Sequence, residues 1–114
     1  MEDYVNNFLI LTRQVVQPAT DNYPATIAVR RLIRCKSGLE LSVQASATHY
    51  CVPRVNTGPY DKVEVMVMAG ASAIPAAWHE YRDDNSGYDL YAYIPVTMVN
   101  ELIHNHGGVV KIGE

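Results

Sequence analysis

A regular alternation of apolar and polar residues in the middle of the chain most strongly constrains its fold. In residues 39–46, read as LELSVQAS, every second residue is apolar and the residues between are polar or charged. Successive side chains of a β-strand point to opposite faces, so this period of two predicts a strand with one buried face. The same pattern in residues 62–67 and 88–94 predicts two more strands, the latter with Leu90, Ala92 and Ile94 on one face and Tyr91 and Tyr93 on the other.

Short connections determine how these strands pair. Residues 27–35, IAVRRLIRC, fit either a strand or a short helix. Lys36-Ser37-Gly38 then forms a short glycine-bearing link, and two apolar runs joined in this way indicate a hairpin with residues 39–46. The small residues of 69–77, AGASAIPAA, predict a loop.

The two ends of the chain differ in how clearly they indicate structure. Residues 95–106 predict a helix, because Pro95 suits its first turn and Gly107-Gly108 end it. Residues 109–112 follow as a short edge strand. Residues 4–16 carry apolar positions that fit a helix or a strand, and a turn-rich connection, 18–25, comes next.

Together these elements predict a single α+β domain over residues 1–114. Its core, residues 27–114, is a small twisted, mainly antiparallel sheet of four or five strands with the C-terminal helix packed on one face. Residues 1–26 are expected to form an N-terminal extension. A chain of 114 residues with 48% apolar content is long enough to bury such a core.

Composition excludes several classes of protein. No run of about 18 apolar residues is present, so no membrane span is expected, and the polar N-terminus is not that of an export signal. Duplex DNA requires several clustered cations, and a chain of net charge −3 with only nine Lys and Arg residues is a poor candidate for binding it. Cys35 and Cys51 lack metal-binding or redox spacing and are expected to be free thiols in a cytoplasmic protein.

The stretch THYCVPR, residues 48–54, gathers an imidazole, a phenol, a thiol and a guanidinium. His49 and Cys51 would share a strand face and could form a nucleophilic dyad, but no third residue that orients them is evident. A buried, inert Cys51 is the favoured interpretation. His104 and His106 are two apart on a helix and do not share a face, so no metal site and no cofactor are expected.

Binding of an anion or nucleotide is the other interpretation of this stretch. A guanidinium can form two parallel hydrogen bonds to a phosphate, and phenol rings stack on bases. We expect Arg54 to anchor such a ligand, beside polar side chains on the exposed face of the strand that leads to it. The alternative is structural, with the tyrosines half-buried and Arg54 paired with Asp61. The predicted binding residues are Ser42, Gln44, Thr48, His49, Tyr50, Arg54 and Tyr60.

Four motifs resemble a family of short proteins encoded by bacteriophages and prophages. They are SVQAS at 42–46, HYCVPR at 49–54, GPY with VEV at 58–65, and YIPVTMVNELIHNHGG at 93–108. The resemblance spans roughly residues 33–108, and the family has no assigned activity. Met66-Val67-Met68 departs from its usual glycine-and-aromatic continuation. The resemblance implies a viral origin and a setting inside the infected bacterial cell.

A function follows as an expectation. Small size, the viral resemblance and the missing catalytic signature favour a non-enzymatic phage protein that binds and neutralises a component of host antiviral defence. Its partner would be a host defence protein or a small anionic, nucleotide-like ligand. The alternatives are a phage structural or assembly accessory protein and a small Cys/His-dependent enzyme. Six of the eight tyrosines follow residue 49, and this aromatic surplus predicts a homo-oligomer, most simply a dimer.

Overall fold

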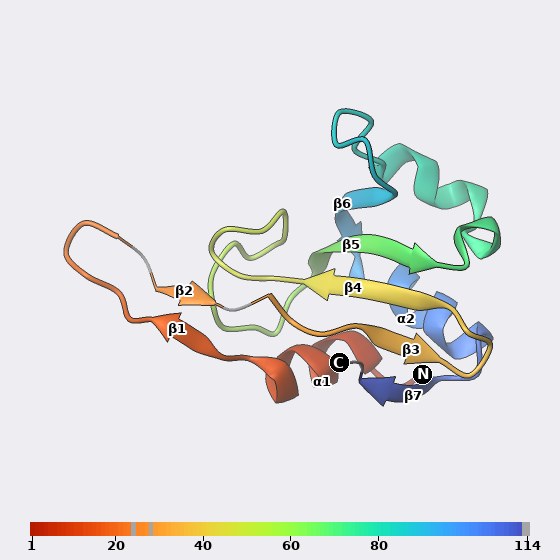
Figure 1. The fold of residues 1–114 in the computed structure, drawn as a ribbon, viewed down its shortest axis with the longest axis horizontal. Coiled ribbons are helices and arrows are strands. Elements are labelled where there is room, and N and C mark those ends of the chain that lie inside the picture. Colours follow the sequence, from red (N-terminus) through yellow and green to blue (C-terminus); the bar gives the residue numbers. More distant parts are fainter. Residues whose placement is uncertain (24, 28, 113–114) are drawn as a thin grey trace.

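The computed structural model, which describes residues 1–23, 25–27 and 29–112, contains a five-stranded antiparallel sheet with helices on one face (Figure 1). The strand order is β6-β5-β4-β3-β7. The strands are β3 (Ile33–Cys35), β4 (Glu40–Gln44), β5 (Lys62–Ala69), β6 (Leu90–Pro95) and β7 (Val109–Ile112). The predicted α+β class is confirmed. Pro24, Ala28 and residues 113–114 of the expected segments lie outside the described residues.

Two helices cover the buried face of the sheet. Helix α2 (Val96–Asn105) follows β6 directly, and helix α1 (Tyr4–Thr12) packs against α2 and β4. The Asp3 side chain caps α1 by accepting the Asn6 N–H at 3.1 Å. The Asn100 side chain of α2 accepts the Val5 N–H at 3.0 Å, which fixes the two helices together.

One hydrophobic core joins helices and sheet. It contains the alternating valines of β5, which are 0–8% exposed, and three residues of α1. Those three are Val5, Phe8 and Leu9. Part of the expected N-terminal extension, 1–26, is therefore core helix, and helix and strand both occur in it.

The rest of that segment is an arm. Strands β1 (Val15–Gln17) and β2 (Thr26–Ile27) pair antiparallel and project from one end of the molecule, which measures 44 × 30 × 24 Å (Figure 1). Loop 45–61 lies at the same end of the sheet as the arm (Figure 1). Asn56 in this loop donates a hydrogen bond from its side-chain N–H to the Ala25 carbonyl at 3.0 Å, so loop and arm are in contact.

The loop predicted over residues 69–77 is wrong in part. It contains the 3₁₀ helix η1 (Ala71–Ala73) and the start of a second one, η2 (Ala76–Tyr81). Trp78 of η2 is only 1% exposed and packs edge-on against Tyr91, with ring centroids 5.2 Å apart. The large indole therefore anchors a segment whose small residues alone gave no helical signal.

A bulge in β6 overturns the predicted alternation of its side chains. Val63 and Val65 of β5 pair with Ile94 and Tyr91, so three steps of β6 oppose two of β5. Tyr93 adopts φ +54°, which is uncommon for a bulky residue. Tyr91 is consequently buried on the same side as Ile94, while Tyr93 is exposed.

None of the described helices combines the length and apolar character needed to cross a bilayer.

The turn after α2 brings Gly107 against the β3–β4 connection. Gly107 has φ +91°, and a Cβ there would lie 2.6 Å from the Cβ of Lys36. Gly38 has a similar φ of +96° but no atom within 4 Å of its would-be Cβ. A side chain at residue 38 would therefore meet backbone strain alone, whereas one at residue 107 would meet both backbone strain and steric overlap.

We expect Gly107→Ala to be clearly more destabilising than Gly38→Ala. The left-handed backbone costs alanine roughly 1–2 kcal/mol at either position. Overlap with Lys36 adds about 1–3 kcal/mol at residue 107 alone. Urea unfolding of the two variants measures the difference, and equal losses would contradict the close approach of the two turns.

Candidate functional site

A pocket of about 320 Å³ lies where α1, the segment before β3 and loop 45–61 meet. We call it the arginine pocket. It is lined by two arginines, several polar side chains and an apolar wall, and no aspartate or glutamate is among the lining residues. These are Asn6, Leu9, Ile10, Arg13, Arg30, Asn56, Thr57, Gly58 and Tyr60.

Arg30 is the unusual residue of this pocket, because it is a charged side chain only 4% exposed. Its Nη1 donates to the Ala45 carbonyl at 2.7 Å. Its Nε has no acceptor, and no carboxylate pairs with it within the described ranges. Burial lowers the pKa of the Arg30 guanidinium, yet an arginine stays charged in a protein. A buried charge without an ionic partner is costly and is a candidate for binding an anion.

Gln44, at the end of β4, fixes the backbone of Arg30. Its Oε1 accepts the Arg30 N–H at 2.9 Å, and its Nε2 donates to the Arg30 carbonyl at 2.9 Å. The same Nε2 donates to Ser42 Oγ at 3.1 Å. The amide thus replaces a neighbouring strand where the regular pairing has stopped. We call this arrangement the Gln44 clamp.

Asn6 of α1 holds Tyr60 in the same way. Its Oδ1 accepts the Tyr60 N–H at 2.8 Å, and its Nδ2 donates to the Tyr60 carbonyl at 3.1 Å. The Tyr60 hydroxyl donates to the Val55 carbonyl at 2.8 Å, which closes the loop on itself. The Tyr60 ring is therefore a fixed wall of the pocket.

Asn56 connects the remaining parts. Its carbonyl accepts the Nε–H of Arg13 at 2.8 Å, and its Oδ1 accepts the Ala47 N–H at 2.8 Å. With its bond to Ala25, this residue joins the end of α1, the arm and the segment after β4. The exposed Arg13 is thereby held at the rim, close enough for its charge to lower the Arg30 pKa further.

The seven residues predicted from the sequence do not form one surface. Tyr60 lines the arginine pocket, and Ser42 and Gln44 belong to the clamp beneath Arg30. The expected exposed polar face of the strand is wrong at two positions, because Gln44 is 5% and Ser46 1% exposed. Gln44 shares the outer face of β4 with Ser42, to which it bonds, but the segment around Arg30 covers it there, and Ser46 lies beyond the end of β4.

Thr48 and His49 lie in a turn organised by Ser46. The Ser46 hydroxyl is 3.1 Å from Thr48 Oγ1 and 2.6 Å from His49 Nδ1. The Cys51 thiol donates to the Ser46 carbonyl at 3.1 Å, and burial raises its pKa. A raised pKa disfavours the thiolate that a nucleophile needs. Both members of the conceivable dyad are thus bonded to Ser46, and Cys51 packs as a buried thiol.

Tyr50 and Arg54 form a second location with Tyr93, which we call the aromatic surface. The Tyr50 and Tyr93 rings have centroids 5.7 Å apart, and the Arg54 guanidinium lies 5.7 Å from the Tyr50 centroid. The Tyr93 N–H donates to the Tyr50 carbonyl at 3.1 Å, so the β6 bulge supports the loop. The ion pair of Arg54 with Asp61, which the structural alternative requires, does not occur among the described residues.

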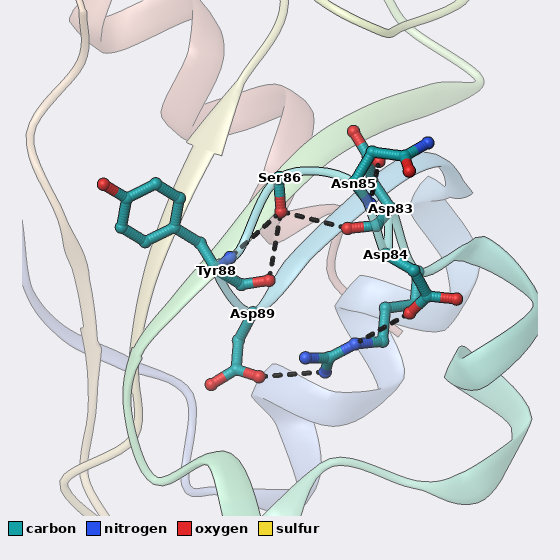
Figure 2. Close-up of polar contacts among 7 residues, drawn as sticks. Asp83, Asp84, Asn85, Ser86, Tyr88 and Asp89 are labelled. Atoms are coloured by element: carbon teal, nitrogen blue, oxygen red, sulfur yellow. Dashed lines mark hydrogen bonds and ion pairs between the residues drawn. The ribbon is translucent and has the colours of Figure 1, made fainter.

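An acidic turn at residues 83–89 forms a separate polar cluster (Figure 2). Arg82 pairs with Asp84 at 3.3 Å and with Asp89 at 2.9 Å. The Asp83 carboxylate accepts the Asn85 N–H at 3.0 Å and so stabilises its own turn. Each of these carboxylates thus interacts with a group of the same chain. The described residues contain no group of three or more His, Cys, Asp or Glu side chains that could hold a metal ion.

Sequence reasoning missed Arg13, Arg30 and Asn56. Arg30 lies within the run IAVRRLIRC, where a charged residue amid apolar neighbours was the available signal. Arg13 and Asn56 are 43 positions apart and become neighbours only through the packing of α1 against the loop. No family model matches the chain, and neither a curated protein nor a solved structure matches it.

We expect Gln44→Met to destabilise the protein strongly, although methionine fills nearly the same volume. The change leaves the buried N–H and carbonyl of Arg30 without partners, at about 1–3 kcal/mol for each unsatisfied group. Ser42→Ala is the matched control, since it removes a hydroxyl that accepts from the same amide but is partly exposed. Denaturant unfolding should show a loss at Gln44 several times that at Ser42; similar losses would contradict the clamp.

A second prediction concerns pH. Burial is the main reason that the pKa of His49 lies below its ordinary value, with Arg30 and Arg54 acting in the same direction and Glu64 opposing them. As pH falls, His49 is therefore protonated in the unfolded chain before it is protonated in the folded protein. The contribution of neutral His49 to stability is present above about pH 6.5 and is lost as pH falls below that value. We expect His49→Gln to flatten the decline in unfolding free energy between about pH 7 and 5. An unchanged slope in urea titrations at a series of pH values would contradict this.

Proposed function

We propose that the protein is a non-enzymatic binding protein that holds a small anionic, nucleotide-like ligand in the arginine pocket. The observation that carries the proposal is Arg30, a buried guanidinium on the pocket wall without a carboxylate partner in the described part of the chain. A guanidinium has five N–H donors, and Arg30 uses one of them on Ala45. An anion in the pocket would supply the missing charge and acceptors.

The other walls suit an organic body attached to that anion. Leu9 and Ile10 of α1 and the ring of Tyr60 provide apolar contact, while Asn56 and Thr57 provide polar groups at the edge. Ligand sites commonly combine an apolar lining with a few fixed polar groups in volumes of about 300–1,000 Å³. A nucleotide, with a flat base and a phosphate, matches this division.

The biological setting comes from the resemblance to phage-encoded proteins. A small phage protein that binds a nucleotide tightly in the cytoplasm of the infected bacterial cell can remove a signal that host antiviral defence depends on. Such a role requires tight binding of the nucleotide and no chemical conversion of it. The buried Cys51 thiol, whose pKa is raised, fits a protein that does not use a cysteine nucleophile.

The aromatic surface supports a second candidate, in which the partner is a host defence protein. Tyr50 and Tyr93 are 41% and 38% exposed, and Arg54 is exposed beside them. Tyrosine and arginine are enriched at protein interfaces. The unusual backbone of Tyr93 favours this candidate, because strained residues concentrate at functional positions.

We also propose that the protein forms a homo-oligomer. The arm presents Val16 and Tyr23 to solvent at 54% and 73% exposure. A two-stranded hairpin such as the arm is marginally stable in water without a packing partner. A second copy that packs against the arm would bury these side chains.

Native mass spectrometry of the protein from infected cells tests these proposals. The wild-type protein should retain a small anionic compound and should be a dimer or higher closed oligomer. Arg30→Met should lose the compound, because a charge-assisted hydrogen-bonding group worth about 1.5–3 kcal/mol or more has been removed. Arg54→Met is the matched control and should retain it.

The opposite pattern would decide against the arginine pocket. If Arg54→Met loses the compound and Arg30→Met keeps it, the ligand binds at the aromatic surface. If the purified protein carries a host protein and no small molecule, the second candidate is correct. Open polymers without either would favour an assembly role. Thermal unfolding of both variants identifies loss caused by misfolding, and Arg30→Lys, which keeps the charge, provides a further check.

A further inference from the structure

A second hollow adjoins the arginine pocket and shares two of its arginines. We call it the outer hollow; it has a volume of about 390 Å³ and lies between the end of α1 and the segment before β3. Arg13 and Arg30 line both spaces, and Arg31 lines the outer hollow alone. The two spaces are therefore neighbours that share two arginines.

Within the described residues, these three arginines lie together without an ion-pair partner, whereas two of the other three are ion-paired and the third stacks on an aromatic ring. Arg34 pairs with Glu40 at 3.4 Å, Arg82 pairs with two aspartates, and Arg54 stacks on Tyr50. For Arg13, Arg30 and Arg31, the described residues provide no carboxylate within ion-pair distance, and neither hollow has an acidic residue in its lining. A chain of net charge −3 thus gathers three uncompensated positive charges at one place.

Both arginines of the shared wall are held in position before any ligand arrives. Arg30 is fixed by the Gln44 clamp and by its bond to the Ala45 carbonyl. Arg13 donates to the Asn56 carbonyl at 2.8 Å. Donors that are already ordered lose less conformational entropy when they bind, and fixed spacing lets them select ligands by the spacing of their charges.

We propose that the ligand carries two phosphate groups joined directly or by a short linker, one in the arginine pocket and the other in the outer hollow. This rests on the proposed function and specifies its ligand class. One phosphate, with a charge of about −1.5 to −2, leaves part of the +3 cluster unbalanced, whereas two phosphates match it. Arg30 and Arg13 contact both groups from the shared wall, and Arg31 contacts only the second.

Binding of defined probes to the full-length protein tests the proposal. Isothermal titration is carried out with inorganic phosphate, pyrophosphate, AMP and ADP at fixed ionic strength. Pyrophosphate should bind at least tenfold more tightly than phosphate, and ADP at least tenfold more tightly than AMP. Arg31→Gln should reduce ADP affinity about tenfold and leave AMP affinity within about threefold. Arg31 is exposed, so this variant is expected to fold.

Two controls separate this proposal from general electrostatic attraction. Arg54→Gln removes the same charge outside both hollows and should leave the ADP-to-AMP ratio unchanged. Arg30→Met should abolish the binding of all four probes. A drop in ADP affinity for Arg54→Gln equal to that for Arg31→Gln would overturn the proposal.

The remaining outcomes distinguish failure of the two-phosphate ligand from failure of the proposed function. Equal affinity for AMP and ADP, or no measurable binding of pyrophosphate, overturns the two-phosphate ligand. The pocket itself still stands in that case if the compound retained from infected cells is lost in Arg30→Met. If that compound is unaffected by Arg30→Met, the proposed function fails as well.

Discussion

Two side-chain amides hold the irregular part of this structure together. Gln44 bonds to both backbone groups of Arg30, and Asn6 does the same for Tyr60. Each amide supplies one donor and one acceptor to a residue that has left the regular sheet. Buried backbone groups must find such partners, so these clamps allow non-repetitive chain to lie against the core. The walls of the arginine pocket are built on the two residues that they hold.

This construction explains how a buried, unpaired guanidinium is tolerated. The cost of burying Arg30 is offset by the packing of β4 and β5, whose inward side chains are almost completely enclosed. Filling the space with an apolar residue would remove that cost, as replacement of buried ionic groups often does in other proteins. A cation held at a fixed point reduces the entropy that is lost when an anion binds, which is the property that the proposed function requires.

Much of the fold could be predicted because alternation and helix-end residues act locally. The pattern in 62–67 gave β5, the residues around Pro95 and Gly107 gave α2, and the short link after Cys35 gave the β3–β4 hairpin. The bulge at Tyr93 could not be predicted, since it depends on how β6 meets β5 and loop 45–61. Alternation places Gln44 on the outer face but does not predict its burial, since the Arg30 segment that covers it comes from 14 positions away in the sequence.

The candidate site was harder to predict for the same physical reason. It is built from three segments far apart in sequence, and the residues that connect them act through backbone groups, which any residue type offers. Asn56 is the clearest example: its side chain bonds to Ala47 and Ala25, and its carbonyl accepts from Arg13. The arm is therefore attached to the site through Asn56, not merely appended to the core. Any assembly that moves the arm must also act on the rim of the pocket, so ligand binding and self-association are expected to be coupled.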